Sequence, residues 1–196
     1  PDGMCAYGLK CDGISCIANP CPAGFVLVPA WTYRMGSPDN EPGRVTGGGD
    51  ETLHKVTISK PFCMAEAEVT NAEWAAVTAT TPSYFKDAGD NVAVQNINWY
   101  DAIKFLNMKS TADGLTPCYA TGEESGTHGG GCVEGQIQCS GDFRLAPVAR
   151  VPACTGYRLP PGATALAISR RNTSLRSRWY YALPVFNRRY PVPAAQ

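Results

Sequence analysis

The sequence predicts one small domain that combines short strands with helices and is held together by disulfides. Residues 25–28 and 54–58 have the apolar residues of strands, and Thr70 and Asn98 precede runs with helical spacing. Nine cysteines are spread over 196 residues that also hold 20 Gly and 16 Pro. With 44% hydrophobic residues, the chain is long enough to bury one core.

Residues 1–24 predict a Cys-rich lead-in without much regular structure, because Gly, Pro, Asn and Asp fill the gaps between its cysteines. The first group of disulfide candidates is Cys5, Cys11, Cys16 and Cys21. Zinc sites space their ligands more closely, and no His lies nearby, so the group does not fit zinc. Four cysteines allow three pairings, and the spacing does not choose among them.

Two strands are expected, residues 25–28 and 54–58, with an exposed loop between them. Residues 54–58, HKVTI, alternate apolar and polar side chains, which predicts one buried face. The stretch that separates them from residues 25–28 is rich in Gly, Pro and Asp and predicts a surface loop.

Two helices should follow. The first covers residues 71–77, with Thr70 as cap and Glu73 reaching back to the cap amide. The second begins at Asn98, carries Asp101 in its first turn and stops near Gly114. Its apolar residues at helical spacing are expected to face the core: Trp99, Ala102, Ile103 and Leu106.

Residues 117–156 are expected to be loop-like, and such segments bury too little apolar surface to offset their ordering entropy. A second group of disulfide candidates should hold them: Cys118, Cys132, Cys139 and Cys154. Eight cysteines can pair, which leaves Cys63 as the odd thiol. We interpret Cys63 as a buried small hydrophobe, with a reactive thiol as the alternative.

The residue patterns assign no catalytic, cofactor-binding or metal-binding side chain. His54 and His128 have no spacing that suggests a metal site or a base beside a nucleophile. A packing or surface role is favoured for both.

Six ordered motifs carry a family resemblance over roughly residues 21–160. They are VPAWTYRMGS, HKVTISKPF, EVTNAEW, VAVQNINWYDAIKFLN, GLTPCY and CTGYRLP. In this order they resemble the formylglycine-generating enzyme family, also called the sulfatase-modifying factor domain. The resemblance implies an irregular, loop-rich α+β fold related to C-type lectin domains, of which the N-terminal half is present and the C-terminal part is incomplete.

The resemblance also implies a catalytic activity and its metal ions. Full-length members hold copper with two cysteine thiolates in the C-terminal half, bind calcium, and oxidise a cysteine of a sulfatase to formylglycine. No cysteine here maps onto the copper ligands, so the chain as written is expected to be inert. Whether the chain is an enzyme stays open. One hypothesis is a copper-dependent oxidoreductase that acts on a sulfatase or other protein. The alternative is a non-catalytic extracellular binding or scaffold domain.

Charge and motifs divide the chain into three parts: the lead-in 1–24, the partial domain 25–160, and an Arg-rich tail 161–196 that does not match the family pattern. Residues 1–142 hold 8 Lys/Arg and all 17 Asp/Glu, whereas residues 143–196 hold 9 Arg and no acid. Our hypothesis is that the tail is read out of frame. The alternative is a contact with single-stranded nucleic acid through Arg and aromatic residues, although nucleic acid is not an expected partner of an exported protein.

The cysteine content favours a secreted, periplasmic or cell-surface protein, because disulfides persist in oxidising compartments. The alternative, a Cys-rich cytosolic metal protein, is disfavoured by the cysteine spacing. No apolar run approaches the roughly 20 residues that span a bilayer.

Overall fold

The computed structural model describes residues 9–11, 16–18, 20–43, 51–85, 89–131, 141–160 and 187–188. Within them lie two helices and ten short strands, so the α+β class is confirmed. In chain order the elements are β1 Leu9–Cys11, β2 Cys16–Ala18, β3 Phe25–Val28, β4 Trp31–Met35, β5 His54–Ile58, β6 Phe62–Ala65, α1 Asn71–Thr78, α2 Trp99–Ala112, β7 Tyr119–Ser125, β8 Arg144–Arg150, β9 Tyr157–Arg158 and β10 Asn187–Arg188.

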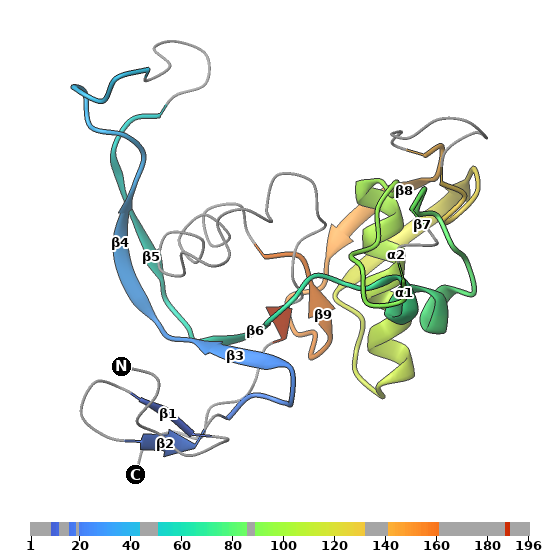
Figure 1. The fold of residues 1–196 in the computed structure, drawn as a ribbon, viewed down its shortest axis with the longest axis horizontal. Coiled ribbons are helices and arrows are strands. Elements are labelled where there is room, and N and C mark those ends of the chain that lie inside the picture. Colours follow the sequence, from blue (N-terminus) through green and yellow to red (C-terminus); the bar gives the residue numbers. More distant parts are fainter. Residues whose placement is uncertain are drawn as a thin grey trace.

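The strands form a central four-stranded sheet and three two-stranded ribbons. The central sheet has the order β3-β6-β10-β9, and the ribbons are β1-β2, β4-β5 and β7-β8. Figure 1 shows the β4-β5 ribbon curving away on one side of the central sheet, with both helices and the β7-β8 hairpin on the other. We call the β4-β5 ribbon together with β3 and β6 the ribbon side, and the two helices together with β9 and the β7-β8 hairpin the helical side.

The ribbon side contains both predicted strands and one that was not predicted. β3 and β5 coincide with residues 25–28 and 54–58. β4, Trp31–Met35, lies where the sequence predicts the start of an exposed loop, and it pairs antiparallel with β5 from Trp31↔Ile58 to Met35↔His54. Its inward-facing residues, Trp31 and Tyr33, have rings stacked 4.9 Å apart.

Both helices begin where the sequence predicts, because each start is fixed by a local capping box. Thr70 accepts the Glu73 N–H at 3.2 Å, while the Glu73 carboxylate accepts the Thr70 N–H at 2.9 Å. Asn98 and Asp101 make the same reciprocal pair at the start of α2. α1 ends at Thr78, one residue beyond the prediction, and Ala79 follows in the left-handed region at φ 56°.

The prediction that Trp99 faces the core is wrong. Its side chain is 49% exposed, whereas Ala102, Ile103 and Leu106 are buried as expected. Trp99 is the first residue of α2, so its ring lies at the helix end, where it contacts Tyr100 edge to face at 5.1 Å. Phe105, 1% exposed, supplies the aromatic core contact of this helix by stacking on Trp74 at 4.8 Å.

The loop predicted for residues 117–156 contains a regular hairpin. β7 and β8 pair antiparallel from Tyr119↔Arg150 to Ser125↔Arg144. The sequence signal is weak because β7 exposes every residue after Tyr119, and because Pro147 in β8 argues against a strand. Gly122 lies opposite this proline, and a Cβ atom on Gly122 would come within 2.6 Å of Pro147 Cδ. The hairpin is thus compatible with Pro147 only beside a glycine.

The larger core lies on the helical side. Twelve of the described buried residues form it: Val69, Trp74, Val94, Ile103, Phe105, Leu106, Cys118, Tyr119, Phe143, Leu145, Cys154 and Tyr157. A smaller cluster on the ribbon side consists of Val28, Ile58, Phe62 and Met64.

Two disulfides are present among the described residues, and one corrects the sequence prediction. Cys63, expected to be the odd thiol, is bonded to Cys21 with the two Cα atoms 5.5 Å apart. The pairing of β3 with β6 aligns Phe25 with Ala65, so the residues just before β3 reach β6. The second bond, Cys118–Cys154, joins two members of the predicted second group at the open end of the β7-β8 hairpin.

The remaining cysteine candidates lie wholly or partly outside this description. Cys5, Cys132 and Cys139 are outside the described residues. Of Cys11 and Cys16 the structure describes the backbone, which places them opposite each other in the β1-β2 ribbon.

Candidate functional site

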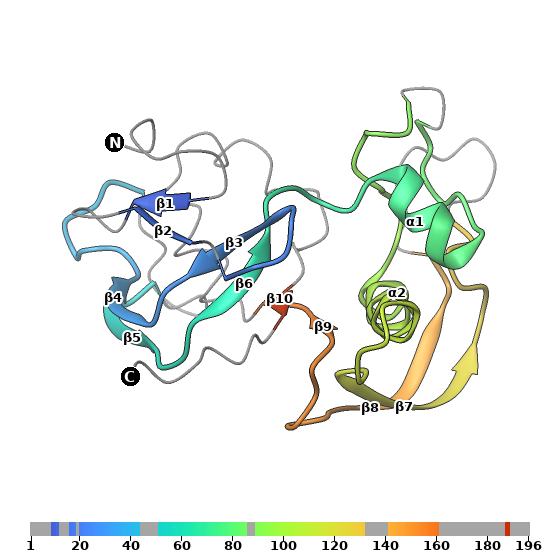
Figure 2. The same cartoon turned by 90° about the horizontal axis from the view of Figure 1, so that it is seen from below.

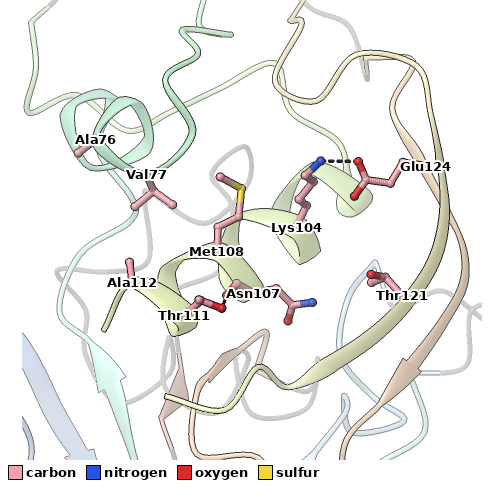
Figure 3. A pocket seen from close by; sticks show the side chains of 9 residues that line it. All are labelled: Ala76, Val77, Lys104, Asn107, Met108, Thr111, Ala112, Thr121 and Glu124. Atoms are coloured by element: carbon pink, nitrogen blue, oxygen red, sulfur yellow. Dashed lines mark hydrogen bonds and ion pairs between the residues drawn. The ribbon is translucent and has the colours of Figure 1, made fainter. Parts of the chain in front are cut away.

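A hollow on the helical side lies between α1, α2 and β7 (Figure 3). Its volume is about 540 Å³. The lining residues are Ala76, Val77, Lys104, Asn107, Met108, Thr111, Ala112, Thr121 and Glu124. Five of them belong to one face of α2, spaced three or four residues apart, and this spacing is the sequence signal that could have found the groove.

Three polar residues of this groove, Lys104, Asn107 and Glu124, have partners inside the protein. Lys104 and Glu124 form an ion pair that Figure 3 shows at one end of the groove. Asn107 donates from Nδ2 to the Tyr119 carbonyl at 2.8 Å and accepts the Tyr119 N–H at 3.2 Å. Because the amide holds the start of β7, it acts as a structural link between α2 and the hairpin.

A buried carboxylate joins the start of α2 to the β7-β8 loop. Asp101 is 1% exposed and accepts two backbone N–H groups, from Asn98 at 2.9 Å and from Gly129 at 2.8 Å. Asn98 in turn donates from its side chain to the Phe143 carbonyl at 2.9 Å. At the positive end of the helix, the carboxylate thus joins the start of α2 to Gly129, and the Asn98 side chain joins it to Phe143.

His128 completes this cluster as a packing residue, which was the favoured role. Its ring centroid lies 5.5 Å from that of Trp74 and 5.0 Å from that of Phe143. Nε2 lies 3.2 Å from the Asp101 carbonyl oxygen, a position suited to donating a proton. Burial lowers the pKa of His128 below its ordinary value, so the neutral ring is favoured.

The second histidine, His54, is not part of this cluster. His54 is exposed on β5, and its Nδ1 lies 2.8 Å from the Thr52 carbonyl oxygen. The structure therefore does not bring the two histidines together.

A second hollow of about 480 Å³ lies between the central sheet and the helices. Phe25 and Tyr157, whose rings stack at 6.0 Å, form part of its wall. Glu66, Glu68 and Glu73 also line it. Glu73 is engaged in the α1 capping box, so it serves the helix rather than the hollow.

The described residues do not fit the copper that the family resemblance implies. The site that the resemblance implies holds copper(I) with two cysteine thiolates, soft ligands that select this ion. Cys21, Cys63, Cys118 and Cys154 are each bonded to another sulfur, and a disulfide offers no thiolate. Among the described residues, no group of three or more His, Cys, Asp or Glu side chains is arranged to hold a metal ion.

One comparison with known proteins confirms the family resemblance. A family model described as "Sulfatase-modifying factor enzyme 1-like domain" matches residues 18–183, which extends beyond Pro160. A curated relative from Paenibacillus barcinonensis, "Chaperone protein LppX", is 32% identical over 108 residues, covering 55% of this chain and 35% of that protein. The chain thus spans about a third of the length of this relative.

Two solved structures are similar in part. "Treponema denticola variable protein 1" has 27% identity and a TM-score of 0.47, covering 68% of this chain and 48% of that one. PvdO from Pseudomonas aeruginosa has 24% identity and a TM-score of 0.39, covering 53% and 44%.

Proposed function

Because the chain belongs to the family of the sulfatase-modifying factor enzyme 1-like domain, whose model matches residues 18–183, we propose that it is an exported, non-catalytic domain that binds a polypeptide. One observation carries the non-catalytic part of the proposal. All four cysteines whose side chains are described are paired in disulfides, so none of them supplies a copper-binding thiolate.

The groove between α1, α2 and β7 supports the same reading. A nucleophile or general base needs a polar atom free to meet a substrate. Here Lys104 is paired with Glu124, and Asn107 is bonded to the backbone of β7. What the groove offers in addition is apolar surface from Val77, Met108 and Ala112, which suits contact rather than proton transfer.

The relative named as a chaperone supports a polypeptide as the ligand, since binding other proteins is what that name describes. The match covers part of both proteins, and the polypeptide ligand of this chain remains our proposal. We assign the binding role to residues 25–160, with residues 1–24 as a lead-in and residues 161–196 as a tail that contributes β10 to the central sheet.

Export is supported by the two disulfides, which persist in oxidising compartments. Within the described residues, no helix is long and apolar enough to cross a membrane. The relation of this fold to C-type lectin domains, which the family resemblance implies, stays a prediction.

The second candidate is the copper-dependent oxidase of the family, with a sulfatase cysteine as substrate. Family membership favours it. In this case the copper ligands would be cysteines other than the four in the described disulfides.

One experiment separates the two functions. The purified 196-residue chain is mixed with copper(I), dioxygen and a cysteine-containing peptide from a sulfatase active site, with a Cys-to-Ser version of the peptide as control. Aldehyde is measured by oxime trapping and mass spectrometry, and binding by calorimetry. We expect binding of both peptides without aldehyde. Aldehyde formed on the cysteine peptide would establish the oxidase instead, and absence of binding would remove sulfatases from the ligands.

A further inference from the structure

The outer edge of the β7-β8 hairpin borders the groove between α1, α2 and β7. β7 pairs with β8 on one side and with no other described strand, so its opposite edge carries backbone groups outside any ladder. Figure 2, in which α2 is seen end-on, shows the hairpin and α1 on different sides of this helix. In Figure 3, β7 curves past α2 with β8 beyond it. The outer edge of β7 is therefore one wall of the groove.

The strand register identifies which backbone groups of β7 point away from β8. The Asn107 side chain on α2 bonds both the C=O and the N–H of Tyr119, so these two groups point toward the helix. Backbone direction alternates along an antiparallel strand, so Thr121 and Glu123 point the same way as Tyr119. Among the described residues, nothing bonds the outward N–H and C=O groups of Thr121 or Glu123. These groups can pair with another strand.

The floor of the groove offers apolar surface beside this edge. Val77 of α1 and Met108 and Ala112 of α2 line it. The volume of about 540 Å³ lies within the range of roughly 300–1,000 Å³ that is typical of ligand sites. The ion pair of Lys104 with Glu124 marks one end of the groove (Figure 3). An extended segment beside β7 would therefore have apolar side chains beneath it.

The charge of this wall favours a ligand with a basic residue. β7 carries two adjacent carboxylates, Glu123 and Glu124, and Lys104 pairs with Glu124. Glu123 is exposed, and no described residue forms an ion pair with it. A lysine or arginine of the ligand would complement it. A second copy of this chain is a poor occupant, because antiparallel pairing of β7 with its copy would bring the carboxylates of both chains close together.

We propose that the outer edge of β7 accepts an extended segment of a polypeptide ligand, which pairs with Thr121 and Glu123. Its apolar side chains contact the groove floor, and a flanking basic residue meets the Glu123 carboxylate. Addition of a strand to a sheet gives affinity through backbone hydrogen bonds and selectivity through alternate side chains. The inference rests on the proposed polypeptide-binding function and names its site, its mode of binding and its ligand class.

The test uses the full chain and a fluorescent Lys-Val-Thr-Val-Thr-Val-Lys peptide, with affinity measured by anisotropy. Two control peptides carry N-methyl groups, one at its Val positions and the other at its Thr positions. In a paired strand only one of these two sets of N–H groups faces β7. One control should therefore bind as well as the unmodified peptide, and the other at least about fivefold more weakly. Equal binding of the two controls, or no binding of the unmodified peptide, would overturn the proposal.

Proline variants of the protein locate the edge that binds. Thr121→Pro removes an outward N–H and leaves the bonds between β7 and β8 in place, so the affinity should fall at least about fivefold. Arg150→Pro is the matched control. It puts the same ring on the outer edge of β8 and should leave the affinity unchanged. Equal effects of the two prolines would contradict the assignment to β7.

Glu123→Lys tests the charge at an exposed residue, where the fold is not at risk. The lysine-flanked peptide should bind about threefold more weakly, and a glutamate-flanked version should bind more tightly. An unchanged preference, or dimerisation of the chain in place of peptide binding, would overturn the proposal. Those results would leave polypeptide binding elsewhere on the domain intact, whereas aldehyde formation on the sulfatase peptide would refute the proposed function and not this edge.

Discussion

The helical side and the ribbon side of the molecule are stabilised by different means. The helical side packs twelve buried residues into one cluster, whereas the buried cluster of the ribbon side has four. In the β4-β5 ribbon, five cross-strand pairs and the half-buried rings of Trp31 and Tyr33 take the place of a deep core. Burial should therefore dominate the stability of one side, and strand pairing and a disulfide that of the other.

Replacing one tryptophan on each side should give the largest difference in lost free energy of unfolding. Trp74 is 1% exposed, stacks on Phe105 at 4.8 Å and donates from Nε1 to Thr80 Oγ1 at 2.9 Å. Trp74→Ala should lower the free energy of unfolding by about 4 kcal/mol. Trp31→Ala, which removes a half-buried ribbon ring, should cost about 1 kcal/mol. Denaturant unfolding measures both, and equal losses would contradict the proposed division.

Removal of the Cys21–Cys63 bond should affect mainly the ribbon side. The bond closes a loop with a sequence separation of 42 residues, and Cys21→Ala with Cys63→Ala should cost about 3 kcal/mol. Hydrogen exchange should show lost protection in β3 and β6, with α2 still protected. The matched control is Cys118→Ala with Cys154→Ala, which should instead loosen the β7-β8 hairpin. Equal loss of protection in α2 from both double variants would show that the two sides unfold as one.

Loss of the buried carboxylate should separate the hairpin loop from α2. Asp101→Ala leaves the Gly129 N–H without its acceptor and should cost about 2 kcal/mol. Asp101→Asn keeps one acceptor oxygen and should cost less. Thermal unfolding of both variants gives the comparison, and an equal loss would mean that the charge rather than the acceptor matters.

The smallest predicted effect is on the pH dependence of the free energy of unfolding. Burial lowers the pKa of His128 in the folded state, so the unfolded chain binds the proton more readily. The contribution of this ring to stability is complete above the ordinary value of about 6.5 and is lost as pH falls from there through the lower folded pKa. His128→Gln should therefore flatten the dependence of unfolding free energy on pH below about 6.5.

Local features were predictable because their causes lie within a few residues. The capping boxes at Thr70 and Asn98 involve residues three positions apart, so both helix starts could be found from sequence. The groove could be anticipated in part, since its α2 residues recur at helical spacing. The hairpin could not, because its residues are mostly exposed and Pro147 opposes the strand pattern.

The sequence by itself determined the family, the mixed α+β class, the helix starts and the need for disulfides. Only the tertiary structure decided that Cys63 bonds to Cys21 and that Trp99 is exposed. It also decided that Asn187–Arg188 lies between β6 and β9. The disulfide and the place of β10 depend on which strands pair across large sequence distances, and no local pattern of polar and apolar residues encodes that choice. The exposure of Trp99 follows from its position as the first residue of α2.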